Sequence, residues 1–427
     1  MKRLYRAALI ASEYHREPRR ADVLVEGDRI TGVADSITAV SDATTIDCAG
    51  QILLPSLFDV HVHAREPGRE DKETIHSCSE AAINGGITGM VLQPNTNPAI
   101  DSAAAVQNVL DIAREKSRIW PSVFTTGAIT KGRKGEELAG IAGMKGRGVV
   151  YLTDDGDSVS NPQVLRRAME YAKQFDLALA SHCEVKELSG KGSMHEGSVS
   201  YSLGLQGIPS ISEEICIARD IRLAEYIGVH LHIQHVSTAL GMNTIRRAKD
   251  RGIRVTCEVA PHHLIFNHEH IGNYDTHYKM NPPLRTAADN AALLQGLIDG
   301  IFDVIATDHA PHTEFEKNQD FASAPFGITG LETALPSLFH HYIAKGAFGW
   351  DLLVKRYANE PRRLIKLPDT EIKEGNLAEF ILFDPTRSTT FTPEFMKSKS
   401  KNTPFLNKTL QGQVTHVHYR GQDLLSR

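Results

Sequence analysis

The sequence predicts an α/β protein in which a (β/α)8 TIM barrel carries a small β-sandwich domain formed by both chain termini. Two observations predict the barrel: apolar runs of strand length recur along the middle of the 427-residue chain, and amphipathic stretches of helical length separate most of them. Strand-like segments at both ends of the chain predict the second domain. The apolar runs are residues 53–60, 87–92, 122–126, 148–152, 177–180, 229–233, 253–259 and 302–306.

The number and spacing of these runs favour a closed barrel over an open sheet. Eight βα units in roughly 270 residues match the ~250 residues typical of such a barrel. Residues 161–174 and 212–226 are the clearest amphipathic helices between runs. A doubly wound sheet is the alternative, but no Gly-x-Gly-x-x-Gly turn follows the first run.

Both chain ends contribute strands to the predicted small domain. Residues 21–30 read as a hairpin around a Gly-Asp turn, and residues 378–383 and 414–419 are rich in β-branched and aromatic side chains. We therefore expect residues 1–52 and 370–427 to form the β domain and residues 53–369 to form the barrel. The lysine-rich run 397–401 is expected to be a solvated loop.

The composition excludes several classes of protein. A net charge of −5 gives no basic excess for nucleic acid. No apolar run reaches the ~20 residues that a membrane helix needs, and the first residues make a poor secretory signal. Five cysteines lie scattered without Cys-x-x-Cys spacing, which is typical of a reducing compartment. We expect a cytoplasmic protein with no nucleic acid or membrane partner.

Metal-ligand side chains follow five of the eight predicted strands. In a barrel the carboxyl ends of all strands meet at one mouth, so these residues are expected to converge there. Histidines two apart on the first strand point to the same side. Two adjacent aspartates follow the fourth strand, and either could serve as the ligand. The candidates are His61, His63, Asp154 or Asp155, His182, His235 and Asp308.

Imidazole and carboxylate ligands without thiolate suit zinc, with manganese, iron or cobalt as alternatives. Four histidines and two aspartates exceed the needs of one catalytic ion, so two ions sharing a bridging carboxylate are favoured over one. A bound metal ion lowers the pKa of water from 15.7 to about 7, which suits hydrolysis at a carbonyl carbon or its reversal. Asp308 is the candidate general base and acid.

Four further polar residues at the predicted mouth indicate the substrate. Arg65 offers a planar fork for a carboxylate, and Asn95 and Asn281 match amide donors and acceptors. His312 follows the eighth strand in the same loop as Asp308. This mixture suits an anionic cyclic amide or ureide, although Asn95 taken alone is better explained by a turn in its Pro-Asn-Thr sequence.

These motifs resemble those of class I dihydroorotases, which are cyclic amidohydrolases of the amidohydrolase superfamily. The resemblance covers nearly the whole chain, and the motifs run in family order. They are residues 61–68 (HVHAREPG), 94–96 (PNT), 153–156 (TDDG), 235–238 (HVST), 281–285 (NPPLR), 307–312 (TDHAPH) and 325–333 (PFGITGLET).

The resemblance implies reversible cyclisation of N-carbamoyl-L-aspartate to L-dihydroorotate, a step of pyrimidine synthesis. It implies one or two zinc ions on His61, His63, Asp155, His182, His235 and Asp308, with Asp155 chosen because it precedes Gly156. It also implies that Arg65, Asn95 and His312 hold the substrate carboxylate, that Asn281 holds the ring, and that Phe326 and Gly327 complete the pocket.

Two other functions are compatible with the same motifs. A hydantoinase or allantoinase would share the metals but not the carboxylate clamp. A non-catalytic relative would only support aspartate transcarbamoylase, and filled ligand positions count against it. A homodimer or a complex with aspartate transcarbamoylase is a further expectation. No lysine lies between residues 146 and 167, which disfavours a carboxylated lysine as the metal bridge.

Overall fold

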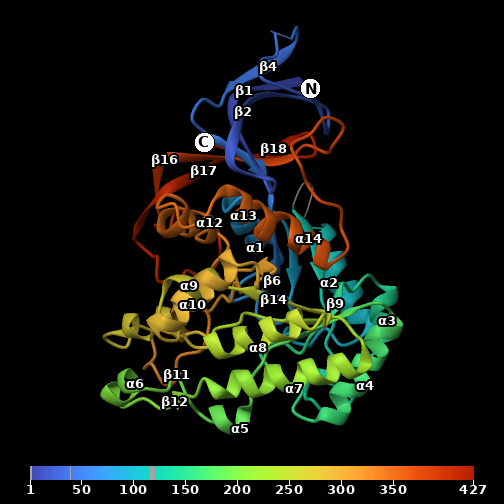
Figure 1. Cartoon of the computed structure of the whole chain (residues 1–427), viewed down its shortest axis with the longest axis vertical. Helices are drawn as coiled ribbons and strands as arrows, with labels where there is room; N and C mark the ends of the chain where they lie inside the picture. The colour runs from blue at the N-terminus through green and yellow to red at the C-terminus, as the bar shows by residue number, and fades with distance from the viewer. Residues whose placement is uncertain (1, 39, 116–120) are drawn as a thin grey trace.

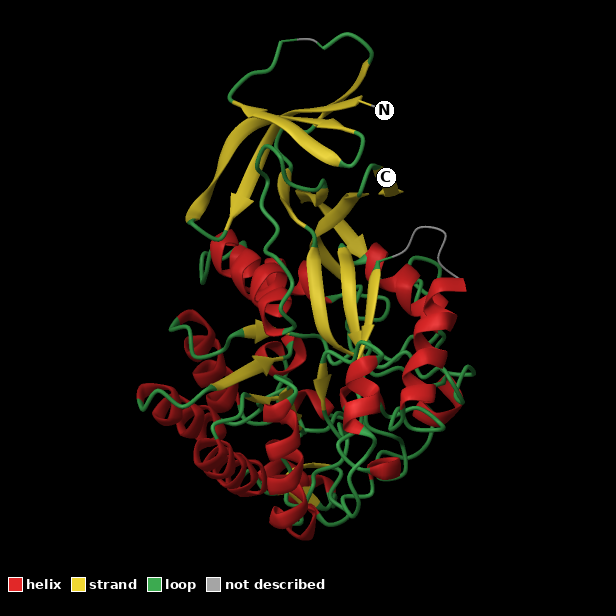
Figure 2. Cartoon of the chain, turned by 90° about the vertical axis from the view of Figure 1, so that its right-hand side faces the viewer, coloured by secondary structure: helices red, strands yellow, loops and turns green. Residues whose placement is uncertain are grey.

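A computed structural model describes residues 2–38, 40–115 and 121–427. Its chain forms a barrel surrounded by helices, with a sheet above it that contains both chain ends (Figure 1). Figure 2 shows the helices packed around the outside of the barrel strands and the terminal sheet standing apart at one end. Among the described residues, no helix combines the length and the apolar character needed to cross a bilayer.

Eight parallel strands build the barrel. They fall into a three-stranded sheet, β6-β7-β8, and a five-stranded sheet, β15-β14-β13-β10-β9. Two parallel bridges, Gly127 with Leu152 and Val62 with His309, join the two sheets and close the ring. The strands are β6 Leu57–Val62, β7 Ile87–Leu92, β8 Ser122–Thr125, β9 Tyr151–Leu152, β10 Ala178–Ser181, β13 Leu231–Ile233, β14 Val255–Val259 and β15 Val304–Ile305.

Side chains fill the interior of the barrel. Phe58 and Tyr151 are fully buried there beside small residues such as Ala180 and Ala306. A Cβ atom on Gly89 would lie 2.3 Å from the Phe58 ring, so only glycine leaves room for this aromatic side chain. The barrel is therefore a packed core, and chemistry is confined to its ends.

The predicted helices 161–174 and 212–226 are confirmed as α4 and α7. Asn161 caps α4 by accepting from Gln163 N at 2.9 Å, and Pro162 occupies the first turn, where its missing N–H costs nothing. The helices around the barrel are α1 Ile75–Asn84, α2 Ala103–Glu115, α3 Ile141–Gly146, α4 Pro162–Gln174, α7 Ile211–Ile227, α8 Ala239–Asp250, α10 Ala287–Ile298, α12 Ala334–Leu338, α13 Trp350–Val354 and α14 Glu360–Leu364. Shorter elements in the loops are α5 Lys186–Ser189, β11 Met194–His195, α6 Ser198–Leu203, β12 Gly207–Ile208, α9 Pro261–Ile265 and α11 Glu314–Lys317.

The terminal sheet has two arms because β1 changes partners. Its first half pairs with β4 and its second half with β5, and Ala7 takes a positive φ of 57° at the irregularity between them. Tyr5 packs edge-on against Phe380 with ring centroids 4.9 Å apart, so the arms share one apolar core, as expected of a sandwich. The strands are β1 Lys2–Ser12, β2 His15–Glu26, β3 Arg29–Ala34, β4 Ala43–Asp47, β5 Ile52–Pro55, β16 Glu379–Thr390, β17 Thr409–Tyr419 and β18 Gln422–Ser426.

The predicted strand at residues 53–60 is two strands instead of one. β5 pairs with β1 and β16 in the terminal sheet, whereas β6 pairs with β7 in the barrel. Ser56 separates them, and its N–H donates to Glu379 O at 3.2 Å. The chain passes directly from the terminal sheet into the barrel here, so the carboxyl ends of the barrel strands face away from that sheet (Figure 2).

A C-terminal segment, residues 391–408, returns to the mouth of the barrel. Its apolar side chains, such as Phe391 and Phe405, pack against Phe266 and Leu284 from the barrel loops. The expectation of a solvated loop at 397–401 is wrong, because Ser398 is fully buried. The serines of this run face inward and the lysines between them lie further out, which a lysine-rich composition does not reveal.

Candidate active site

The structure brings the six predicted metal ligands together at the mouth of the barrel. None is more than 4% exposed. Their ligand atoms form three overlapping triplets in which all atoms lie within 4.8 Å of one another. The triplets are His61, His63 and Asp155; His61, His235 and Asp308; and Asp155, His182 and His235.

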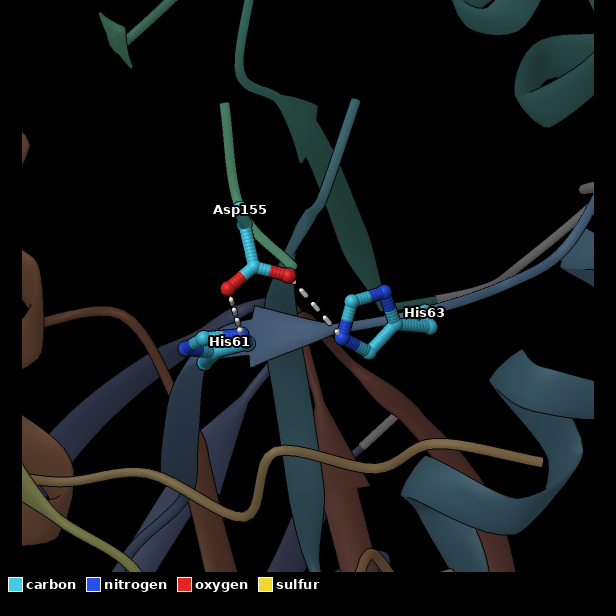
Figure 3. A group of neighbouring side chains, drawn as sticks. All are labelled: His61, His63 and Asp155. Carbon is cyan, nitrogen blue, oxygen red and sulfur yellow. Dashed lines mark ion pairs between the residues drawn. The ribbon is translucent and has the colours of Figure 1, made fainter. Parts of the chain in front are cut away.

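Asp155 lies between the histidines of the first strand. Its Oδ1 is 3.3 Å from His61 Nε2 and its Oδ2 is 3.3 Å from His63 Nε2 (Figure 3). The same Oδ1 lies 3.5 Å from His235 Nε2. One carboxylate thus faces histidines from two sides, which is the arrangement that a bridging ligand requires.

The neighbouring aspartate has a structural role. Asp154 Oδ1 accepts from Ile129 N at 2.8 Å and from Thr130 N at 3.1 Å, so this carboxylate fixes the loop after β8. Its side chain is absent from all three triplets. The choice of Asp155 over Asp154 therefore agrees with the geometry.

Three site residues have backbone angles that few side chains adopt. The φ values are 59° at Arg65, 30° at His235 and 46° at Asp308. Such conformations cost about 1–3 kcal/mol each and persist only where the surrounding fold imposes them. All three lie where a barrel strand gives way to its loop, and all three line the same cavity.

Glu258 supports the cluster from below and was not predicted. Its carboxylate accepts from His61 Nδ1 at 2.5 Å, from His232 Nε2 at 3.1 Å and from the backbone N–H of His235 at 3.1 Å. A carboxylate on Nδ1 leaves His61 Nε2 to face the triplets. The signal in the sequence was the one carboxylate inside the apolar run 253–259, at the end of a strand to which no ligand had been assigned.

The charges of the cluster favour deprotonated carboxylates. Burial alone raises the pKa of Asp308, but His61, His63 and His235 hold that pKa well below its usual value. Burial alone lowers the pKa of His61, yet Glu258, Asp155 and Asp308 together raise it. The site therefore concentrates negative charge around nitrogen ligands, which suits a divalent cation.

Two buried atoms that face each other in the cluster, His61 Nε2 and Asp155 Oδ1, have no hydrogen-bond partner among the described residues. Buried polar atoms without partners are costly, and a metal ion bound to them would remove that cost. The donor set and these unpartnered atoms fit the metal that the sequence predicts.

A cavity of about 200 Å³ opens beside the cluster. Five of the six predicted substrate-binding residues line it. They are Arg65, Asn95, Asn281, His312 and Phe326. Asn95 Oδ1 is 2.7 Å from His63 Nδ1, and Asn281 Nδ2 is 3.5 Å from His182 Nε2, so both amides also touch the proposed ligands.

Arg65 carries a charge on which the nearby carboxylates Asp308, Asp155 and Glu316 act only from beyond ion-pair distance. Its Nε donates to Pro311 O at 3.2 Å, and its Nη2 lies 3.4 Å from His312 Nε2. In the part of the chain that the structure describes, no carboxylate lies within ion-pair distance of its guanidinium. Burial lowers the pKa of Arg65 only to about 10, so the group stays charged at neutral pH. An anion in the cavity would supply the missing partner.

Lys72 sets the tautomer of His312 and was also not predicted. Lys72 Nζ lies 3.0 Å from His312 Nδ1. Lys72 and Arg65 can both only donate, so the shorter contact decides: Nδ1 accepts from Lys72, and the imidazole hydrogen sits on Nε2, beside the Arg65 guanidinium and available to an anion in the cavity. Burial together with the charges of Arg65, Lys72 and Lys317 lowers the pKa of His312 to about 2, which keeps the ring neutral.

Gly327 stands behind the cavity wall. A Cβ atom there would lie 2.4 Å from Ala310 O and 2.7 Å from the His312 ring, so glycine permits this close packing. Asn402 ties the same loops together: its Oδ1 accepts from His312 N at 3.0 Å, and its Nδ2 donates to Ala310 O and Gly327 O at 3.0 Å each. Gly327 thus shapes the cavity through its neighbours.

Solved structures share this fold. The L-hydantoinase (dihydropyrimidinase) of Arthrobacter aurescens superposes with a TM-score of 0.88 at 22% identity, covering 100% of this chain and 96% of its own. The dihydropyrimidinase of Brevibacillus agri gives 0.84 at 23% identity, with 100% and 95% covered. At this level of identity the likeness establishes the barrel with its terminal sheet and nothing finer.

Sequence comparison identifies the family. The Dihydro-orotase-like family profile matches residues 50–240. The chain is 43% identical to the dihydroorotase of Carboxydothermus hydrogenoformans, covering 94% of this chain and 93% of the relative. It is 44% identical to the dihydroorotase of Syntrophotalea carbinolica, covering 97% and 96%. Identity of this extent, spread over nearly the whole of each chain, makes this protein a member of the dihydroorotase family.

Proposed function

We propose that this protein is a dihydroorotase, which interconverts N-carbamoyl-L-aspartate and L-dihydroorotate in pyrimidine synthesis. The observation that carries the proposal is the guanidinium of Arg65 beside a histidine–aspartate cluster in one cavity. The substrate on either side of the reaction bears a carboxylate, which supplies the anion that Arg65 lacks. The names of the relatives support the same activity.

The six clustered residues hold zinc in this proposal, and two ions are favoured because Asp155 faces histidines from two sides. When bound, zinc polarises a carbonyl oxygen and lowers the pKa of water. Glu258 orients His61, and Asn95 orients His63, so both rings are fixed before metal binds.

The substrate is positioned by residues around the cavity. Arg65, Asn95 and the Nε2–H of His312 take the carboxylate, and Asn281 takes the ring amide. Phe326 closes one wall of the cavity, where Lys279 Nζ lies 4.6 Å from the centre of its ring. Held in this way, the ring carbonyl carbon faces Asp308.

Asp308 moves the proton. In hydrolysis it takes a proton from the attacking water as the carbon–oxygen bond forms, and it gives that proton to the ring nitrogen as the carbon–nitrogen bond breaks. In ring closure it takes the proton from the carbamoyl nitrogen and gives it to the departing oxygen. Its low pKa provides the deprotonated form with which hydrolysis begins.

The test is ring closure of N-carbamoyl-L-aspartate by the purified protein, with the metal content of the same sample measured. We expect turnover of the carboxylated substrate and at least tenfold lower kcat/KM with a neutral hydantoin, since only the former engages Arg65. Preference for the neutral ring would make the protein a hydantoinase. Full metal content without turnover would make it a non-catalytic relative, and mixing with aspartate transcarbamoylase would then test the predicted complex.

A further inference from the structure

We propose that the terminal domain holds a second site for a divalent metal ion, formed by Tyr5, His416, His418 and Asp423. The site is separate from the barrel mouth. His416 and His418 are two apart on β17 and therefore share one face, Asp423 lies on β18, and Tyr5 reaches them from β1. The ligand-type atoms of the two histidines and the aspartate all lie within 4.8 Å of one another.

The four side chains form a closed ring of short polar contacts. Asp423 Oδ1 lies 3.0 Å from His416 Nε2 and 2.7 Å from His418 Nδ1. Tyr5 Oη lies 3.2 Å and 3.1 Å from the same two nitrogens. Neighbouring ligands on a tetrahedral zinc ion, with bonds of about 2.0–2.1 Å, are separated by roughly 3.3 Å. The four contacts of 2.7–3.2 Å are up to 0.6 Å shorter than that separation, so the ring would widen slightly around a bound ion.

Hydrogen bonds within this ring leave either the Tyr5 hydroxyl hydrogen or one imidazole lone pair without a partner. Each imidazole nitrogen touches both the carboxylate oxygen and the phenol oxygen, so there are four contacts and at most three hydrogens. If both nitrogens carry hydrogen, the Tyr5 hydroxyl has no acceptor in the ring. If one nitrogen accepts from Tyr5, its lone pair faces the Asp423 carboxylate at 2.7 or 3.0 Å. A cation at the centre of the ring would instead bind all four lone pairs.

A protonated carboxyl would supply the missing hydrogen, but the neighbourhood opposes it. Arg3 Nη2 lies 2.8 Å from Asp423 Oδ2, on the oxygen that faces away from the ring. Asp423 therefore presents a charged Oδ1 to both rings.

The ring atoms are held rigidly before any metal arrives. His418 stacks on Phe380 with 5.0 Å between centroids and 17° between planes, and Tyr5 contacts the same Phe380 edge-on. Tyr5 and His418 are fully buried. Nitrogen and oxygen donors without thiolate favour zinc or another late first-row divalent ion. Bound there, the ion would join the first strand of the chain to its last hairpin.

The test counts zinc in matched variants. Protein stripped with a chelator is dialysed against zinc chloride, and bound zinc is measured per chain. We expect Asp423→Asn to bind one zinc ion fewer than the unmodified protein, and Asp35→Asn, the same change at a 90% exposed side chain near the terminal sheet, to bind the full number. Equal zinc in all three overturns the proposal. The count is a difference between proteins with the same barrel mouth, so it stands whatever number of ions the barrel binds.

Thermal unfolding with and without zinc tells whether Asp423 stabilises the protein by binding metal or only by hydrogen bonding. If zinc occupies the ring, Asp423→Asn lowers the midpoint of unfolding in zinc, and the difference shrinks when both proteins are stripped. A difference of the same size with and without zinc overturns the proposal. If Asp423→Asn fails to fold, Tyr5→Phe decides, because it removes a single ligand oxygen: we expect zinc binding to this site at least ~10-fold weaker, and unchanged binding rejects the site.

Discussion

Two clusters of histidine and aspartate occupy opposite ends of this molecule, and they differ in what surrounds them. At the barrel mouth, the ligands come from strand ends between His61 and Asp308, and they border a cavity that contains Arg65. In the terminal domain, His416 and Asp423 are close in sequence, and Arg3 forms an ion pair with Oδ2 of the Asp423 carboxylate. In our proposals, the same side-chain types therefore support catalysis at one end of the molecule and stability at the other.

The difference teaches that the neighbourhood of a cluster, more than its ligands, separates a reactive site from a structural one. The mouth contains a cavity, and the guanidinium of Arg65 and the carboxylate of Asp308 both line it. The terminal cluster packs against Phe380 and the strand that carries Tyr5 on one side, and its aspartate, Asp423, is exposed on the other. Substitutions at the two ends should therefore affect different measurements.

The largest effect is expected for Asp308→Asn. It removes the group that carries the proton, so we expect kcat to fall by roughly 10²–10⁴-fold in both directions of the reaction. The fold should survive, as judged by circular dichroism, because asparagine has nearly the same shape. Turnover close to that of the unmodified protein would mean that another group carries the proton.

Arg65→Ala should act on binding. Losing a charge-assisted contact with the substrate carboxylate costs about 2–4 kcal/mol, which corresponds to a roughly 30- to 1000-fold rise in KM. Metal content, measured on the same preparation, should be unchanged. A parallel loss of metal would instead assign Arg65 to the support of the cluster.

Glu258→Gln should weaken the cluster from below. Without the carboxylate on its Nδ1, His61 loses its fixed orientation, and we expect metal affinity or kcat/KM to fall by about 10–100-fold. Glu379→Gln is the matched control, because Glu379 is equally buried but pairs with Arg362 in the terminal sheet. A similar loss of metal in both variants would indicate a general effect of buried charge.

Lys72→Met should raise KM modestly. Without the donor on Nδ1, the neutral His312 ring can place its hydrogen on either nitrogen, which costs about 1 kcal/mol or roughly a fivefold rise in KM, while kcat stays near its original value. Lys72→Arg keeps a donor and should retain most of the affinity. The exposed Lys399→Met serves as a control for loss of charge, and an equal rise in KM there would contradict the role of Lys72.

The smallest effect on catalysis is expected at the other cluster. Asp423→Asn should leave kcat/KM within about twofold of the unmodified protein while lowering the free energy of unfolding by about 1–2 kcal/mol. Steady-state kinetics and chemical denaturation measure the two quantities. A catalytic defect without loss of stability would show that the terminal cluster communicates with the barrel mouth.

The sequence predicted the features that depend on the succession of strands and helices along the chain. Alternating apolar runs and helices placed most barrel strands, and residues that follow those strands converge in any closed barrel, so His182 and His235 could be found without a structure. The split at Ser56 could not be found, because one apolar run serves two sheets that differ only in their partners.

The supporting residues were missed for a different reason. Glu258 contacts a histidine 197 positions away in the chain, and Lys72 contacts one 240 positions away. The spacing of residues along a sequence does not reveal contacts of this kind. The same holds for the ring of contacts between Tyr5 and the two histidines of β17, because it joins β1 to the hairpin formed by β17 and β18. Partners of this kind follow from packing alone.

Asn402 makes the finished cavity depend on a segment that lies outside the barrel strands. Its side chain holds His312, Ala310 and Gly327 in place, although it lies 94 residues after Asp308, the last of the proposed metal ligands. A chain whose barrel strands have closed therefore still lacks a finished cavity until residues 391–408 have packed against the mouth.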